Sequence, residues 1–145
     1  MIVIEREVSV AATPERVFDY LADFRTTEEW DPGTVRTTVT SGDGGVGTTY
    51  HNTSRFSGRE TELTYVTEQL TRPDRVVLRG ENSTVVARDT MTLRRTGELT
   101  RVSYRAEFRF KGLARLAEPF LRRPFKRLGD EAEEGLRNAL GKLSG

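Results

Sequence analysis

The chain has 145 residues, a length typical of one domain that can bury a core and enclose a ligand cavity. Its 23 basic and 22 acidic residues nearly cancel, so no overall electric field favours nucleic acid, and we expect no nucleic-acid partner. Cysteine is absent, which excludes disulfides and thiolate metal sites, and neither a signal sequence nor a membrane-spanning apolar run is recognisable, so we expect a cytoplasmic protein.

The N-terminal part predicts a strand followed by two short helices. Residues 2–10 alternate between apolar and polar side chains, the period of a half-buried strand. Thr13 is then a good N-cap and Pro14 a good first helical residue, with an apolar stripe after them. The stretch "TTEEWDPG" predicts a second helical turn that Trp30 anchors and that the Pro-Gly pair ends.

From residue 35 onward the sequence is rich in Thr, Val, Tyr and Phe and is interrupted by turn residues. We predict six strands, at about 35–40, 46–57, 60–70, 74–81, 85–95 and 100–111. The connections are too short for crossover helices, so the strands should form an antiparallel meander.

A glycine motif interrupts this region. Gly42, Gly44 and Gly47 have the G-x-G-x-x-G spacing of dinucleotide-binding loops. A helix must follow such a loop, yet "TTYHNTSRFSG" comes next and has the period of a strand. We therefore interpret the glycines as hairpin residues that permit positive φ angles.

The C-terminal part predicts the longest helix. Apolar residues recur at intervals of three and four from Leu113 through Leu116, Phe120 and Phe125 to Leu143. Pro119 and Pro124 interrupt the pattern, so we expect a kink or a broken first segment there.

The motifs "TPERVFDYLADFRTTEEWDP", "GGVGTTY" and "RDTMTLRRTGELTRVSYRAEFRFKG", with the closing helix, resemble the START-like (SRPBCC) superfamily, in particular its polyketide cyclase/dehydrase and lipid-transport branch of bacterial proteins. The likeness covers nearly the whole chain as a single domain, residues 1–145. It implies an α+β helix-grip fold: a curved, antiparallel, seven-stranded β-sheet wrapped around a long C-terminal helix, with two short helices between strands 1 and 2. It also implies a cavity between sheet and helix.

The apolar faces of the predicted strands indicate what would line that cavity. Several polar side chains occur on these faces, and a buried polar group without a partner costs about 1–3 kcal/mol, so a pocket for an amphipathic ligand is favoured over a solid core. The candidate ligand-binding residues are Trp30, Tyr50, Asn52, Phe56, Tyr65, Asp89, Met91, Tyr104, Phe108, Leu116 and Phe120.

Asp89 is the only acid on its strand face, and it could orient a ligand hydroxyl or act as an acid or base. The alternatives are a structural ion pair with an arginine or a solvent-exposed position at the edge of the cavity. Tyr50, Tyr65 and Tyr104 could donate to a ligand carbonyl, although tyrosine is also an ordinary core residue. Our catalytic candidates are Tyr65, Asp89 and Tyr104.

The positions of His51 and Trp30 bear on whether the chain could hold a metal and on how the cavity is closed. His51, the only histidine, should face solvent, so neither a His-based metal cluster nor a Ser-His-Asp triad is available. We expect no metal and no cofactor. Trp30 could cap the cavity entrance or attach the second helix to the sheet.

A basic cluster precedes the C-terminal half of the long helix: Arg115, Arg122, Arg123, Lys126 and Arg127. Beside apolar residues it could touch lipid headgroups or RNA, or it could be the solvent-exposed face of an amphipathic helix. A peripheral membrane contact is thus one hypothesis for this segment.

The function we expect is binding of a small hydrophobic or amphipathic molecule by a monomer or homodimer. By resemblance this is a lipid, a polyketide-like molecule or an aromatic metabolite, and cyclase or aromatase activity stays open. The alternative is a regulatory or toxin-like protein of an actinobacterial toxin–antitoxin or stress system that acts through its surface.

Overall fold

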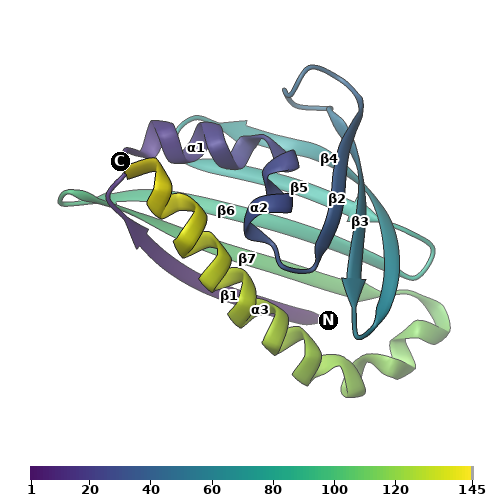
Figure 1. Cartoon of the computed structure of the whole chain (residues 1–145). Coiled ribbons are helices and arrows are strands. Elements are labelled where there is room, and N and C mark those ends of the chain that lie inside the picture. The colour runs from purple at the N-terminus through teal and green to yellow at the C-terminus, as the bar shows by residue number, and fades with distance from the viewer. Residues whose placement is uncertain (145) are drawn as a thin grey trace.

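The computed structural model describes residues 1–144 and contains one sheet with helices on its concave face (Figure 1). The seven strands are all antiparallel and follow the order β1-β7-β6-β5-β4-β3-β2. Their bounds are β1 Ile2–Val10, β2 Thr34–Ser41, β3 Thr49–Phe56, β4 Arg59–Thr71, β5 Arg75–Glu81, β6 Val85–Thr96 and β7 Leu99–Phe110. The predicted fold class is confirmed.

The helices are short except the last. The α-helices are α1 Pro14–Ala22, α2 Thr27–Trp30 and α3 Glu118–Gly141, and the 3₁₀ segments are η1 Phe24–Thr26, η2 Gly112–Ala117 and η3 Lys142–Ser144. The predicted cap of α1 is confirmed, because the Thr13 hydroxyl accepts a hydrogen bond from the Arg16 backbone N–H at 3.3 Å. No helix in residues 1–144 is both long and apolar enough to cross a bilayer.

The segment before α3 departs from the predicted helix. Residues Gly112–Ala117 form 3₁₀ turns, and α3 begins only at Glu118, with Pro119 in its first turn. Proline is favoured there because it has no N–H to satisfy. The expected broken first segment is confirmed, whereas Pro124 lies inside a continuous helix.

The glycine motif forms the turn between β2 and β3. Gly42, Gly44 and Gly47 have φ angles of 100°, 102° and 92°, which other residues rarely adopt. A strand follows the turn, so the hairpin interpretation is confirmed.

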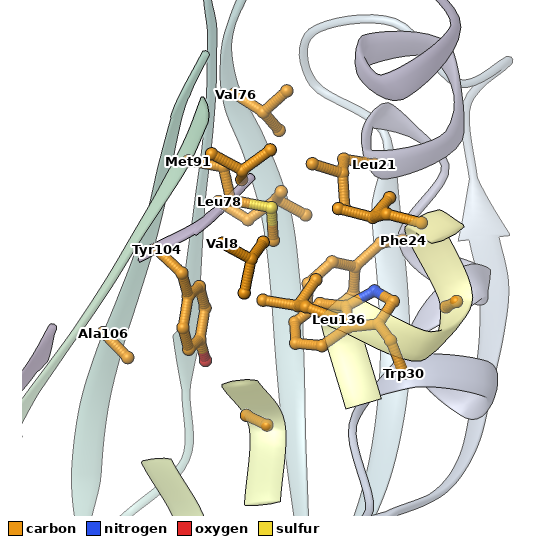
Figure 2. Close-up of a cluster of buried hydrophobic side chains, with 14 of the residues drawn as sticks. Val8, Leu21, Phe24, Trp30, Val76, Leu78, Met91, Tyr104, Ala106 and Leu136 are labelled. Carbon is orange, nitrogen blue, oxygen red and sulfur yellow. The ribbon is translucent and has the colours of Figure 1, made fainter. Parts of the chain in front are cut away.

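The core lies between the sheet and the helices (Figure 2). Leu21 of α1, Trp30 of α2 and Leu136 of α3 all meet strand residues there, such as Leu78 and Met91. The strand alternation predicted from the sequence places these side chains on the concave face, and the packed helices remove that face from water.

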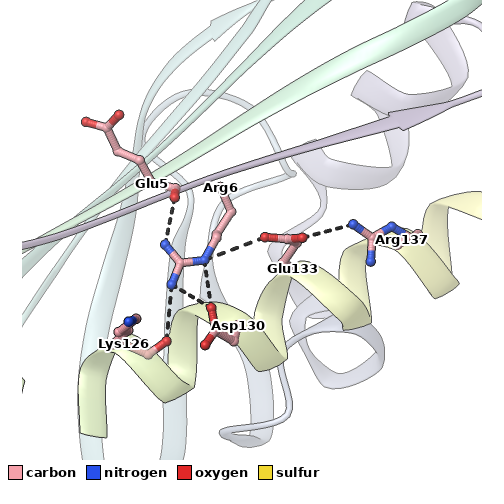
Figure 3. A network of polar contacts seen from close by, with 6 residues as sticks. All are labelled: Glu5, Arg6, Lys126, Asp130, Glu133 and Arg137. Carbon is pink, nitrogen blue, oxygen red and sulfur yellow. Dashed lines mark hydrogen bonds and ion pairs between the residues drawn. The ribbon is translucent and has the colours of Figure 1, made fainter. Parts of the chain in front are cut away.

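Arg6 fastens the edge strand β1 to α3 (Figure 3). Its guanidinium donates to Asp130 Oδ1 at 2.8 Å and to the Lys126 backbone carbonyl at 3.2 Å, and it lies 3.6 Å from a Glu133 carboxylate oxygen. The helix is therefore held against the sheet by charge-assisted hydrogen bonds as well as by apolar packing.

Candidate functional site

A cavity of about 200 Å³ lies between the concave face of the sheet and the first half of α3. Most of its wall is apolar, from Ile4, Leu63, Val85, Phe108, Phe110, Leu121, Leu128 and Ala132. An apolar cavity of about 150 Å³ can hold benzene, so this one has room for a single ring with a short arm.

Four phenylalanines form one end of the cavity. Phe125 of α3 stands between Phe56 and Phe108, with ring centroids 4.5 Å away in both pairs, and Phe110 lies 6.0 Å from it. Tilted and edge-on pairs of this kind add about 0.5–1.5 kcal/mol each beyond their buried area. The packed rings therefore give this part of the cavity an aromatic wall.

Three polar side chains reach the cavity without a protein partner. Asp89 is 6% exposed, and Tyr65 and Tyr104 are each 8% exposed. Within residues 1–144, the Asp89 carboxylate and both tyrosine hydroxyls make no hydrogen bond. Figure 2 shows the Tyr104 hydroxyl at the end of the ring that points away from Met91. Neither alternative for Asp89 holds, since it has no arginine partner in the described chain and is buried.

Asp31 is a second carboxylate of the cavity wall, and sequence reasoning missed it. It follows α2 and accepts hydrogen bonds from the Gly33 backbone N–H at 3.1 Å and from the Thr34 hydroxyl at 2.9 Å. Its only sequence signal is its place before Pro32, which indicates a helix end and no particular chemistry.

Burial and neighbouring groups shift the pKa of both carboxylates. Burial raises the pKa of Asp89 to about 7, and the negative charge of Asp31 contributes to that rise. Burial also raises the pKa of Asp31, while its hydrogen bonds from Thr34 and Gly33 oppose the rise. Burial and the Asp89 charge hold the pKa of Tyr65 and that of Tyr104 well above the usual value, so both phenols stay neutral.

Gly80 allows Tyr65 to lie flat on the sheet. The two residues are paired across β4 and β5, and a Cβ atom at position 80 would come within 2.6 Å of the Tyr65 ring. The absence of a side chain at Gly80 therefore decides how the Tyr65 hydroxyl is placed in the cavity.

The predicted site residues divide into three groups. Five of them line the cavity: Phe56, Tyr65, Asp89, Tyr104 and Phe108. Four lie in the buried interior outside it: Trp30, Tyr50, Asn52 and Met91. Leu116 and Phe120 lie at the surface.

The buried interior residues have structural contacts. Trp30 packs edge-on against Tyr104 at 5.5 Å and does not cap the cavity, so it attaches α2 to the sheet. Tyr50 packs against Phe24 at 5.7 Å. The Asn52 side chain donates to the Thr37 hydroxyl at 2.9 Å and accepts from Ser54 at 2.6 Å, which satisfies its polar atoms.

The expectation that Leu116 and Phe120 line the cavity is wrong. Their side chains are 73% and 82% exposed. The spacing of three and four assigns both residues to the apolar stripe that docks on the sheet, but residues 112–117 form 3₁₀ turns without a buried side chain. Leu121 and Phe125 take the places at the cavity instead.

His51 faces outward, as predicted, with its Nε2 2.9 Å from Glu62. In residues 1–144 no group of three or more His, Cys, Asp and Glu side chains is close enough to hold a metal ion. A wider depression of about 820 Å³ lies mainly on the outer face of the sheet, but charged residues such as Arg88 and Glu68, paired at 3.2 Å, line it.

Comparisons with known proteins agree with this architecture. Three solved structures align over nearly the whole chain. The protein TTHA0849 from Thermus thermophilus has 16% sequence identity and a TM-score of 0.81, with 99% of each chain covered. A START superfamily protein from Mycobacterium smegmatis has 11% identity and a TM-score of 0.80, with 97% of this chain and 98% of that chain covered, and the Zhui aromatase/cyclase from Streptomyces sp. R1128 has 15% identity and a TM-score of 0.77, with 98% and 92% covered. At these identities the likeness shows the fold. The curated proteins gave no match.

The sequence itself carries the family assignment. The family described as "Polyketide cyclase / dehydrase and lipid transport" matches residues 1–141. With its helix-grip fold, the chain belongs to this polyketide cyclase/dehydrase and lipid-transport family.

Proposed function

We propose that this protein binds a small amphipathic molecule, with an apolar body of about one ring and a polar group, in the cavity beside α3. The observation that carries the proposal is the set of three buried side chains, Asp89, Tyr65 and Tyr104, whose polar atoms face the cavity unpaired. Polar groups that converge on a mostly apolar cavity are typical of a ligand site, because a ligand with a complementary polar group can form hydrogen bonds with them.

The aromatic end of the cavity supports the same proposal. Phe56, Phe108 and Phe125 line the same cavity and offer ring faces and edges to the apolar part of a ligand. A reaction in this cavity would use Tyr65 and Tyr104 as hydrogen-bond donors to a developing oxyanion and Asp89 as an acid or base. Binding is the function that we propose, and these are its candidate catalytic groups.

Binding can be tested with 2-phenylethanol, a neutral probe of suitable size, followed by backbone NMR shifts. We expect saturable shifts at cavity residues such as Leu63 and Phe108. Thr61 lies on β4 at the cavity, and Thr64 lies on the same strand but outside the cavity lining. Thr61→Trp should abolish the shifts and Thr64→Trp should leave them unchanged. Absence of saturable shifts at the cavity in the unmodified protein, or equal loss in both variants, would contradict the proposal.

A second candidate function concerns the surface near the cavity. Leu113, Leu116 and Phe120 are 85%, 73% and 82% exposed, the highest values among the large apolar side chains that the structure describes. The same stretch of the chain carries five exposed basic residues, Arg115, Arg122, Arg123, Lys126 and Arg127. We infer that this apolar and basic surface contacts an anionic lipid membrane peripherally.

The physical argument is charge complementarity combined with apolar burial. Between residues 112 and 127 the only acid is Glu118, which already pairs with the Met1 amino group at 2.9 Å and with Arg122 at 3.3 Å. Each basic residue near an anionic bilayer contributes about 1 kcal/mol, and insertion of Leu or Phe adds to this.

Vesicle sedimentation tests the membrane contact. We expect binding to vesicles of phosphatidylcholine with phosphatidylserine, weaker binding to phosphatidylcholine alone, and about a tenfold loss for Leu116→Ser with Phe120→Ser. The control Val35→Ser with Leu99→Ser removes two exposed apolar side chains from other places and should change nothing. Equal binding to both vesicle types, or a dimer in solution that the first double variant dissociates, would contradict a membrane contact.

A further inference from the structure

Among the residues that the structure describes, the cavity wall has two acids and no basic side chain that is free of a partner. Two carboxylates, from Asp31 and Asp89, belong to its wall. The single basic residue of the wall is Arg55, whose side chain is 65% exposed and lies 3.5 Å from the Glu60 carboxylate. Nothing in the cavity lining is therefore placed to neutralise a bound carboxylate or phosphate.

The two acids are not equivalent. Asp31 accepts two hydrogen bonds, and these stabilise its charged form. Asp89 receives none from residues 1–144, although its side chain is more than nine-tenths buried. A buried carboxylate of this kind needs hydrogen-bond donors, and the protein supplies none beyond the neighbouring Tyr65 and Tyr104 hydroxyls, which do not reach it.

An ammonium group supplies the hydrogen-bond donors and the positive charge that the described residues of the cavity wall do not bring to Asp89. It provides three N–H donors and a positive charge, so it can donate to Asp89 and to a tyrosine oxygen at once. Its charge also offsets the repulsion between Asp31 and Asp89, which is strong where water is scarce. A carboxylate in the same place would be a third negative charge.

We propose that the cavity selects an amine, with the ammonium group on Asp89 and one aromatic ring against Phe56, Phe108 and Phe125. This inference rests on the proposed binding function and narrows its ligand to arylalkylamines. Fatty acids and aromatic acids of the same size should be poor ligands.

Protonation of the cavity supplies an independent signature. The titratable groups near Asp89 are Asp31, Tyr65 and Tyr104, and Glu131 of α3 acts on Asp31. Burial holds the pKa of Asp89 near 7, so at pH 6 most molecules carry a proton on this carboxyl. Binding of an ammonium ion must release that proton, so amine affinity should rise as the pH rises from 5.5 to 8.

The experiment compares three probes of nearly equal size: 2-phenylethylamine, 2-phenylethanol and phenylacetate. Titration calorimetry at pH 8 should give an affinity for the amine about tenfold or more above that for the alcohol, and phenylacetate should bind weakest. At pH 6, titrations in buffers of different ionisation enthalpy should show nearly one proton released per amine bound. The affinity for the amine should rise about thirtyfold between pH 5.5 and pH 8, because the ionised fraction of Asp89 rises by that factor, whereas the affinity for the alcohol should not rise.

Matched variants identify the responsible carboxylate. Asp89→Asn should remove the preference for the amine and the proton release while still binding the alcohol, and Asp43→Asn, an exposed change in the β2–β3 turn, should alter neither. Cavity binding of the alcohol without a preference for the amine would overturn this inference and leave the proposed function standing. Tighter binding of phenylacetate would do the same, and no cavity binding of any probe would overturn both.

Discussion

Gly135 of α3 lies directly against the backbone carbonyl of Trp30. A Cβ atom at position 135 would come within 1.9 Å of that carbonyl oxygen and 2.9 Å of the carbonyl carbon. The contact is backbone against backbone, so no side chain can move aside to make room. This close approach sets how deeply α2 enters the space between α3 and the sheet, and thereby where Asp31, the next residue, is held.

Gly135→Ala should destabilise the protein, although glycine to alanine inside a helix normally stabilises by about 0.5–1 kcal/mol. The displaced carbonyl should cost about 1–3 kcal/mol or more, as overpacking does elsewhere. Urea denaturation measures the loss. Gly141→Ala is the control, because a Cβ atom there meets nothing within 4 Å. A gain in stability for both variants would contradict the close contact.

Asp89 should make the protein less stable as the pH rises. Its pKa is about 7 in the folded protein and near 3.8 in the unfolded chain, so the folded state binds the proton more tightly. The protonated Asp89 carboxyl makes its full contribution to the free energy of unfolding below about pH 4. This contribution is lost as the pH rises through 7, a change of at most about 4 kcal/mol. Asp89→Asn should remove this dependence, so the variant gains stability relative to the parent at pH 8. Parallel pH–stability curves for parent and variant would contradict it.

Phe108→Ala should destabilise less than a truncation in the solid core. The Phe108 ring borders the cavity and contacts Phe125, so part of its surface already lacks protein contacts. We expect about 1–3 kcal/mol, against about 3–5 kcal/mol for Phe18→Ala, whose side chain lies in the core away from the cavity. Thermal and urea unfolding compare the two. Equal losses would indicate that Phe108 belongs to a filled core.

Arg6→Met should loosen α3 from β1. The change keeps much of the apolar stem and removes the donors to Asp130 and the Lys126 carbonyl, with an expected loss of about 1–3 kcal/mol. The exposed pair of Arg25 and Asp23, two residues apart, is the comparison, and Arg25→Met should cost less than about 1 kcal/mol. Hydrogen exchange at the amides of α3 should rise in the first variant only.

The strands and the inner face of the sheet could be predicted from the sequence. A strand period of two fixes which side chains share a face, and the short turns leave only antiparallel pairing, so Tyr65, Asp89 and Tyr104 were expected on one face. These three residues lie near one another because short connections place consecutive strands side by side in the sheet.

Asp31 could not be found in this way. It lies 58 positions before Asp89, and the two approach each other only because α2 crosses the concave face of the sheet. That crossing depends on the contact between Gly135 and Trp30, which no local pattern reports. Leu116 and Phe120 were misplaced for the opposite reason: a local pattern was followed across Pro119, where the backbone conformation changes.

The pairing of the first strand with the last has a consequence for synthesis on the ribosome. Ile2 of β1 is the partner of Phe108 in β7, and within residues 1–144 no other strand lies beside β1. At about 5–20 residues per second, the N-terminal strand waits roughly 5–20 s before its partner has been made. During that time Ile2, Ile4, Val8 and Val10 have no sheet to join. The nascent chain therefore exposes an apolar segment from the synthesis of β1 until the synthesis of β7, and during this interval aggregation competes with folding.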